Sequence, residues 1–263
     1  MSAPLSAFQF TPYCGAPPLP EALWRRWNLD PILLVLLISA WAAYLFAARA
    51  GAVPGWRRIS FSVGWGLTTL ALISPLCPLS VALFSARVGQ HMALAGIAAP
   101  LVALGWRPAA APGVSARRSP ILAAVAFAIA LWVWHSPGPY VETFASAPAY
   151  WLMHLTTFGA ALLLWSAIFS AWGDRLEGPA IAILITVLQM GLLGAVITFA
   201  GRPLFASHLI TAPTWGLSPL EDQELGGVIM WVPAGIILAA ALAAGFAEAL
   251  RRAEARTAPR PAA

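Results

Sequence analysis

The segment LWVWHSPGPYVETFASAPAYWLMH, residues 131–154, joins two long apolar runs and brings a histidine to each of them. The first run ends at Trp134 and His135, and the second run carries His154 near its start. Proline and glycine after His135 predict a turn between the two runs. Because the chain reverses at this turn, we expect His135 and His154 to lie at the same end of a helical bundle.

The composition identifies the solvent of the chain. Of its 263 residues, 60% are hydrophobic and 10% are charged, whereas about a quarter of the residues of a soluble domain are charged. The expected environment is therefore a lipid bilayer. The net charge is +5, and all 15 basic residues are arginines. These arginines are spread between apolar runs rather than gathered into a patch, which argues against nucleic acid as a partner.

Seven apolar runs have about the length that spans a hydrocarbon core of ~30 Å. Because backbone in lipid must satisfy its own hydrogen bonds, these runs predict an all-α integral membrane bundle of seven transmembrane helices. The runs are 31–48, 59–83, 86–105, 119–136, 148–171, 178–200 and 225–247. We expect residues 1–30 to form an irregular periplasmic arm, residues 31–248 the membrane domain, and residues 249–263 a basic, disordered cytoplasmic tail.

Arginines are concentrated in alternate connections, which predicts the orientation of the bundle. One side has Arg49, Arg57, Arg58, Arg107, Arg117, Arg118, Arg175, Arg251, Arg252, Arg256 and Arg260, and the other has Arg25, Arg26 and Arg202. The positive-inside rule then puts the C-terminus in the cytoplasm and the N-terminus outside. Trp134 falls at an outer helix end, where tryptophan is expected to anchor the helix in the membrane interface.

With this topology all four histidines lie on the outer side. Neutral imidazole is a common ligand for copper, zinc, iron and nickel, and an ionisable group at membrane depth indicates a functional site. We expect His91 and His154 to converge on a shared metal site with His135 nearby, which requires the third, fourth and fifth helices to pack together at their outer ends. The alternative is a structural role, in which the imidazoles are buried and held by hydrogen bonds. His208 lies in a loop and is the weakest candidate for a metal ligand.

Three methionines and several polar residues accompany the histidines. Met92 adjoins His91, Met153 adjoins His154, and Met230 lies near the outer end of the last helix, where thioethers can serve as soft ligands for Cu(I). Packing is the commoner role of each methionine. Arg87 and Tyr150 lie four residues before His91 and His154, so each pair shares a helix face.

Arg87 is expected either to snorkel to the interface or to pair with an acid such as Glu142, Glu221 or Asp222. Asp222 is expected to cap a helix N-terminus. Gly226 and Gly227 should permit close helix approach. The two cysteines, Cys14 and Cys77, allow a disulfide or a soft-metal site, and we favour free structural thiols.

Five sequence segments are similar to motifs of the CtaG-like family of cytochrome c oxidase assembly factors. They are LFSARVGQHM and APLVALG in the third run, WHSPGPY in the fourth, MHLTTF in the fifth and LEDQELGGVIMW at the start of the seventh. The resemblance covers about residues 31–248. It implies a bacterial inner-membrane protein with seven helices that supplies copper to, or matures, a haem–copper oxidase and catalyses no reaction.

By motif position, three residues of this chain match family histidines and five match the family's last motif. These are His91, His135, His154, Asp222, Gln223, Gly226, Met230 and Trp231. Many members have a histidine where this chain has Arg87, and another near Tyr150. One half of each helical histidine pair is therefore replaced here. This places the metal affinity in question and suggests a site rebuilt with Met92, Met153 or Tyr150.

Two further functions compete with copper delivery. A b-type cytochrome would use His91 and His154 as axial haem ligands, although haem is the less favoured cofactor. A transporter for small solutes or metals would place polar groups through the membrane midplane, where Gln189 is the main polar residue. No nucleophile motif, phosphate-binding loop or metalloprotease motif is present, so no enzyme class is indicated.

Overall fold

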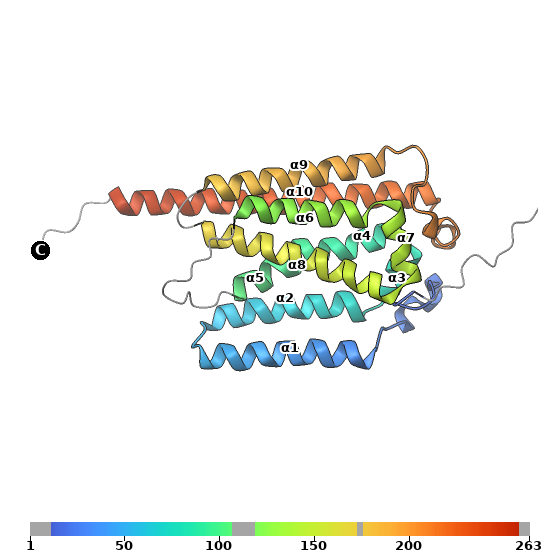
Figure 1. Cartoon of the computed structure of the whole chain (residues 1–263), viewed down its shortest axis with the longest axis horizontal. Helices are drawn as coiled ribbons and strands as arrows, with labels where there is room; N and C mark the ends of the chain where they lie inside the picture. The colour runs from blue at the N-terminus through green and yellow to red at the C-terminus, as the bar shows by residue number, and fades with distance from the viewer. Residues whose placement is uncertain (1–11, 107–118, 173–175, 258–263) are drawn as a thin grey trace, which may run out of the picture.

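The computed structural model describes residues 12–106, 119–172 and 176–257, and within these ranges every regular element is a helix. Figure 1 shows the long helices lying roughly side by side, with the last helix running past the others at one end. The elements are η2 (Pro20–Arg25), α1 (Pro31–Ala50), α2 (Gly55–Ile73), α3 (Leu76–Ala82), α4 (Phe84–Met92), the π-helical segment η3 (Ala93–Ala98), α5 (Ala99–Gly105), α6 (Pro120–Trp134), α7 (Pro137–Ala145), α8 (Ala147–Ala171), α9 (Glu177–Thr198), η4 (Ala206–His208), η5 (Ala212–Trp215) and α10 (Pro219–Thr257).

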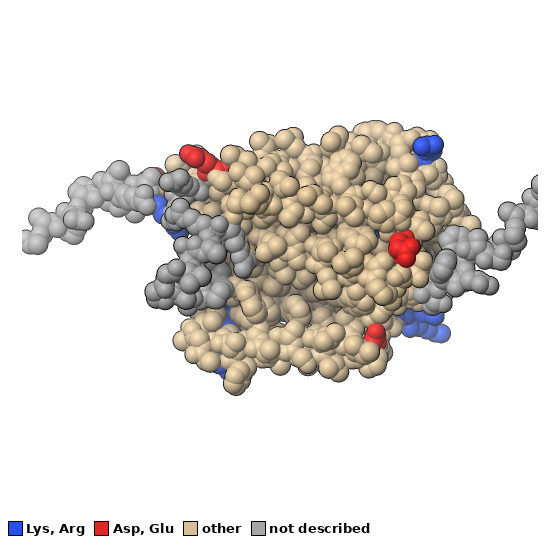
Figure 2. All heavy atoms as spheres, in the orientation of Figure 1, with Lys and Arg blue, Asp and Glu red and all other residues tan. Residues whose placement is uncertain are grey.

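Five helical stretches in the described chain are long and apolar enough to cross a membrane, and up to seven are if each of two bent helix pairs counts as one span. The all-helical fold with several candidate membrane spans is therefore confirmed, and the count of seven spans stays a prediction. Figure 2 shows charged side chains toward the two ends of the visible face and none across its middle. This distribution suits a surface whose central belt faces lipid.

Prolines account for both bends. The axes of α2 and α3 differ by 49°, and those of α6 and α7 by 72°. Pro75 lies between the first pair, and Pro137 opens α7. Because proline has no N–H and disfavours helical geometry in the residue before it, it ends one helix and readily starts another. The segment after His135, predicted as a turn, is thus largely the short helix α7.

The third predicted span is one continuous rod made of α4, η3 and α5. Its middle turn, Ala93–Ala98, is π-helical and follows directly after His91 and Met92. Trp165 on α8 donates a hydrogen bond from Nε1 to the Ala95 carbonyl oxygen at 2.9 Å. A π-turn alters the backbone hydrogen-bond ladder, so a carbonyl there can accept an external donor. The wide turn therefore joins α8 to this rod just below the histidine.

The last helix is longer at both ends than the run 225–247. Ser218 and Glu221 form a reciprocal cap: the Ser218 amide donates to Glu221 Oε2 at 2.7 Å, and the Glu221 amide donates to Ser218 Oγ at 3.2 Å. At the other end the helix continues to Thr257. The prediction of a disordered tail from residue 249 is therefore wrong for residues 249–257, where Glu248 pairs with Arg251 and Arg252 and supports the last turns.

Some of the residues used to predict the orientation lie outside the described ranges. These are Arg107, Arg117, Arg118, Arg175 and Arg260. The first part of the predicted arm, residues 1–11, and the end of the tail, residues 258–263, lie outside them too.

Glycines allow α10 to approach its neighbours closely, as predicted. A Cβ on Gly227 would lie 2.8 Å from the Gly194 carbonyl oxygen of α9, and a Cβ on Gly226 would overlap the Phe84 ring at the start of α4. Both contacts are closer than side-chain carbons can tolerate. The absence of a side chain at two successive positions therefore lets one helix pack against α9 and α4 together.

We expect Gly227→Ala to destabilise the bundle by about 1–3 kcal/mol, because the added methyl group must push α9 and α10 apart. Thermal unfolding of the full chain in mild detergent, followed by circular dichroism, measures the effect. Gly235→Ala on the same helix is the matched control, since nothing lies within 4 Å of its Cβ position. Equal melting temperatures for the two variants would contradict the close approach.

Candidate functional site

Three histidines meet at one end of the bundle, at the end where the α6–α7 bend lies. The centroid of the His91 ring is 5.9 Å from that of His135 and 5.5 Å from that of His154, and both ring pairs meet edge to face. The side chains come from α4, from the C-cap of α6 and from α8. All three residues are buried. We call His91, His135 and His154 the imidazole cluster.

Hydrogen bonds to backbone carbonyls assign the tautomers of two of these rings. His135 Nδ1 lies 2.8 Å from the Leu131 carbonyl oxygen, and His154 Nδ1 lies 3.1 Å from that of Tyr150. A carbonyl oxygen only accepts, so Nδ1 must carry the proton and donate it. The lone pair of each neutral ring is then on Nε2. A ring held by Nδ1–H to a carbonyl, with Nε2 unprotonated, is the usual state of a metal-ligating histidine.

Several ring nitrogens in the cluster have no partner. His154 Nε2 and both ring nitrogens of His91 are buried and make no hydrogen bond to the described part of the chain. An unpaired buried polar atom is costly unless a water or ligand satisfies it. However, no group of three or more His, Cys, Asp or Glu side chains within the described ranges is spaced to hold a metal ion. The cluster consists of three rings in contact, not an assembled chelate.

Arg87, one turn before His91, behaves differently from both expectations. Its side chain is 1% exposed and therefore does not snorkel. Nε donates to the Ser80 carbonyl oxygen at 3.3 Å, and Nη1 donates to Thr143 Oγ1 at 2.6 Å. No ion pair to Arg87 is found in the described part of the chain, so the pairing with Glu142, Glu221 or Asp222 is wrong.

Aromatic rings from α7 take the place of the missing acid. The guanidinium carbon of Arg87 lies 4.1 Å from the ring centroid of Phe144 and 5.0 Å from that of Tyr140. Such contacts attract a desolvated cation by about 2 kcal/mol. Nη2 remains buried and unpartnered. The charge is thus held by neutral acceptors and ring faces next to the imidazole cluster.

His208 is buried and belongs to a different network from the cluster. Its Nδ1 lies 3.2 Å from the Ala82 carbonyl oxygen and must donate to it, so Nε2 accepts from the Tyr140 hydroxyl at 2.6 Å. The loop that carries η4 is therefore tied to both α3 and α7. The role is structural, and the loop position in the sequence gave no sign that this histidine would be 2% exposed.

The two cysteines form a disulfide, with Cα atoms 5.5 Å apart, so the free thiols favoured from the sequence are wrong. Their separation of 63 residues matches no pattern that predicts pairing. Tyr150 lies between this bridge and the cluster. Its hydroxyl is 3.3 Å from Cys14 Sγ, and its ring centroid is 4.3 Å from that of His154.

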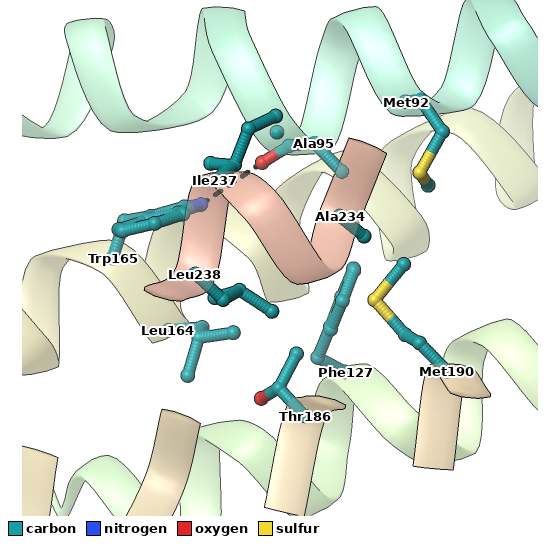
Figure 3. A pocket seen from close by; sticks show the side chains of 11 residues that line it. Met92, Ala95, Phe127, Leu164, Trp165, Thr186, Met190, Ala234, Ile237 and Leu238 are labelled. Atoms are coloured by element: carbon teal, nitrogen blue, oxygen red, sulfur yellow. Dashed lines mark hydrogen bonds between the residues drawn. The ribbon is translucent and has the colours of Figure 1, made fainter. Parts of the chain in front are cut away.

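The predicted methionine ligands occupy packing positions. Met153 and Met230 are completely buried in the main hydrophobic core. Met92 lines a cavity of about 30 Å³, together with Met190, Phe127 and Trp165. Figure 3 shows the two thioethers from α4 and α9 at the edge of this cavity. Met190 was not predicted from the sequence, because nothing in the sequence connects it with the histidines.

The other supporting residues hold helices together. Asp222 does not cap its own helix: it accepts from the Phe84 and Ser85 amides at 2.7 and 3.0 Å and so caps α4. Gln223 binds the α9–α10 connection through the Leu204 amide at 2.6 Å. Trp134 is buried and donates to Thr156 Oγ1 at 2.8 Å, rather than standing free as an interfacial anchor.

Comparison with known proteins adds one finding to this geometry. Residues 40–252 match the family model described as cytochrome c oxidase caa3 assembly factor. The chain belongs to the cytochrome c oxidase caa3 assembly factor family. No curated protein and no solved structure matches it.

The matched residues of this assembly factor include the whole imidazole cluster, Arg87 and the disulfide partner Cys77. Cys14 lies outside them. Sequence reasoning overlooked Thr143 and Tyr140, which hold Arg87 and His208, although Tyr140 stands inside the WHSPGPY segment. A tyrosine directly after a proline carries no signal of its own, and the α6–α7 bend brings it to these partners.

The pH dependence of stability should report on His208, which lies outside the membrane-spanning segments. Burial, with a smaller contribution from Arg87, lowers the pKa of His208 from 6.5 to about 3. Between these values the unfolded chain binds a proton that the folded chain does not. Stability is therefore lost as the pH falls through this window, by up to ~1.4 kcal/mol per pH unit for this one group.

We expect His208→Gln to reduce that slope, because glutamine offers a donor and an acceptor but does not titrate. Unfolding by denaturant at a series of pH values from 8 down to 4, on parent and variant, measures it. The cluster histidines are present in both proteins and cancel in the comparison. Parallel stability curves for parent and variant would contradict a buried neutral His208.

Proposed function

We propose that this assembly factor binds copper at the imidazole cluster and passes it to a subunit of a haem–copper oxidase. The single observation that supports this best is the set of buried ring nitrogens without partners. Neutral imidazole is a copper ligand, and two of the rings already have Nδ1–H tied to a carbonyl. The family membership supplies the oxidase as the destination.

The arrangement suits transient binding better than permanent storage. The rings meet edge to face, so His91, which no hydrogen bond restrains, must rotate for its lone pair to join those of its neighbours. Arg87 keeps a positive charge one helical turn away and opposes a bound cation. Both features weaken affinity, and a protein that hands its metal to a partner needs a site from which the metal can leave.

The metal would be held by imidazole nitrogen. Met92 and Met153, which adjoin His91 and His154 in the sequence, pack in the hydrophobic core and are not counted as ligands. Because cation binding requires neutral rings, burial among apolar and aromatic side chains favours loading. The protein would act as a binding protein and not as an enzyme. A b-type haem protein remains the alternative, and the visible spectrum separates the two, since a Soret band would support haem.

The proposed setting is a bacterial inner membrane crossed seven times, with each bent helix pair counted as one span. The arginine distribution supports a cytoplasmic C-terminus and an N-terminus outside. In that orientation the imidazole cluster is at the periplasmic end, where the copper-containing part of an oxidase is accessible to a delivery protein.

Replacement of His91 and His154 together with alanine should abolish copper binding, because it removes both the unrestrained ring and the ring with a buried lone pair. Copper stoichiometry and affinity are measured by chelator competition on the full chain in mild detergent, with circular dichroism to verify the helices. In cells that lack the parent gene, the same variant should fail to restore haem–copper oxidase activity.

His208→Ala is the matched control for this experiment. It removes a buried histidine from the same end of the bundle, but both ring nitrogens of that residue are already engaged by protein partners. Copper binding should therefore survive. Copper binding by the double alanine variant equal to that of the parent would contradict the proposal. The three histidines would then have only a packing role.

Reporter fusions test the orientation. A reporter that is active only in the cytoplasm should be active when fused after residues 112 and 255, and inactive when fused after residue 212, because the arginine-rich connections stay inside. Activity at 212 would put the imidazole cluster on the cytoplasmic side and remove the basis for periplasmic delivery.

A further inference from the structure

The disulfide lies at the same end of the bundle as the imidazole cluster and is linked to it by one residue. The Tyr150 hydroxyl is 3.3 Å from Cys14 Sγ and 3.6 Å from Cys77 Sγ. The same tyrosine accepts the His154 Nδ1–H bond through its carbonyl oxygen. Tyr150 therefore contacts both the disulfide and His154, one of the rings with an unpaired nitrogen.

One cysteine of the pair is more exposed than the other. Cys14 is half-buried in the N-terminal arm, whereas Cys77, in the first turn of α3, is 0% exposed. A thiolate from outside can attack only an accessible sulfur. Exchange would therefore begin at Cys14 and release Cys77 as the first free thiol.

Contacts other than the disulfide keep the arm in place. The Tyr13 hydroxyl donates to Asp30 Oδ2 at 2.5 Å, and its ring lies 5.0 Å from the rings of both Tyr150 and Trp151. Burial and this hydrogen bond raise the pKa of Tyr13, so the hydroxyl remains a donor at any physiological pH. The residue next to Cys14 is thus anchored independently, and the two sulfurs stay close after the bond between them is broken.

We propose that Cys14 and Cys77, when reduced, form a second copper(I) site beside Tyr150, at the same end of the bundle as the imidazole cluster. The identity of the metal rests on the proposed function, but the site itself does not need the histidines. Thiolate sulfur is the protein ligand that most strongly selects Cu(I). Cα atoms 5.5 Å apart allow both sulfurs to reach one ion without movement of the helices.

The chemistry is a two-electron reduction followed by metal binding. A dithiol reductant gives two electrons and two protons to the Cys14–Cys77 bond, yields two thiols and itself becomes a disulfide. Cu(I) then replaces the thiol protons, and the copper does not change its oxidation state. The Tyr150 hydroxyl and the Asn28 amide, 3.7 Å from Cys77 Sγ, can donate hydrogen bonds that stabilise the negative charge on sulfur.

The test compares copper binding by the oxidised and reduced forms of the full chain in mild detergent. The protein is reduced with a phosphine, which is then removed without oxygen, and the free thiols are counted. Cu(I) is supplied as a complex with a competing chelator. We expect the reduced parent to bind one more copper ion per chain than the oxidised parent, with a sulfur-to-copper charge-transfer band in the ultraviolet.

Variants separate this site from the imidazole cluster. The double variant Cys14→Ser, Cys77→Ser should lose the redox-dependent increment, and so should reduced parent protein whose thiols are alkylated, which avoids any effect of the serines on folding. His91→Ala with His154→Ala should keep the increment. Loss of copper from the histidine variant alone concerns the proposed function and not this site.

Equal copper binding by the oxidised and reduced parent, with two free thiols counted in the reduced form, would overturn the proposal. An increment that persists after alkylation would do the same, because the additional copper would then lie elsewhere.

Discussion

The carboxylate of Asp222 fixes where α4 begins, and the position of every residue of the site on that helix follows from it. Asp222 is 0% exposed and accepts from the Phe84 and Ser85 amides and from the Ser85 hydroxyl. In lipid no water can serve these donors, and each buried donor left without a partner costs about 1–3 kcal/mol. Because Asp222 comes from α10, Gly226 and Gly227 must let that helix lie close enough to deliver it. The close approach of α10 to α9 therefore places Asp222 at the start of α4. This contact sets the rotation of α4 and with it the direction of Arg87 and His91.

Arg87 shows what this placement imposes on the site. A guanidinium buried without a carboxylate is held by Ser80, Thr143 and the faces of two rings. Three of these four partners come from α7, the short helix created by the bend after His135. The bend thus does more than reverse the chain, since it supplies the side chains that make a buried cation tolerable beside three neutral imidazoles. This charge would weaken the binding of copper at the proposed site.

The sequence was sufficient to predict the all-helical fold, the family and the convergence of His91, His135 and His154, because run length and motif order are local signals. It could not predict the contacts that cross between distant elements. Asp222 was expected to cap a helix and does so, but on α4 instead of α10, and no local pattern names the recipient. The pairing of Cys14 with Cys77 depends on the arm folding over α3. The extension of α10 to Thr257 includes Arg251 and Arg252, which pair with Glu248 and whose charge alone had suggested a disordered tail.

The tautomers of the cluster have a local origin that does not depend on those long-range contacts. His135 and His154 each donate Nδ1–H to the carbonyl four residues earlier, so the helix itself sets which nitrogen carries the lone pair. Both rings would present Nε2 even if their neighbours changed. His91 makes no such bond to the described part of the chain, so its own helix does not set its tautomer. The tautomers of two rings are thus set by their own helices, and that of His91 is not.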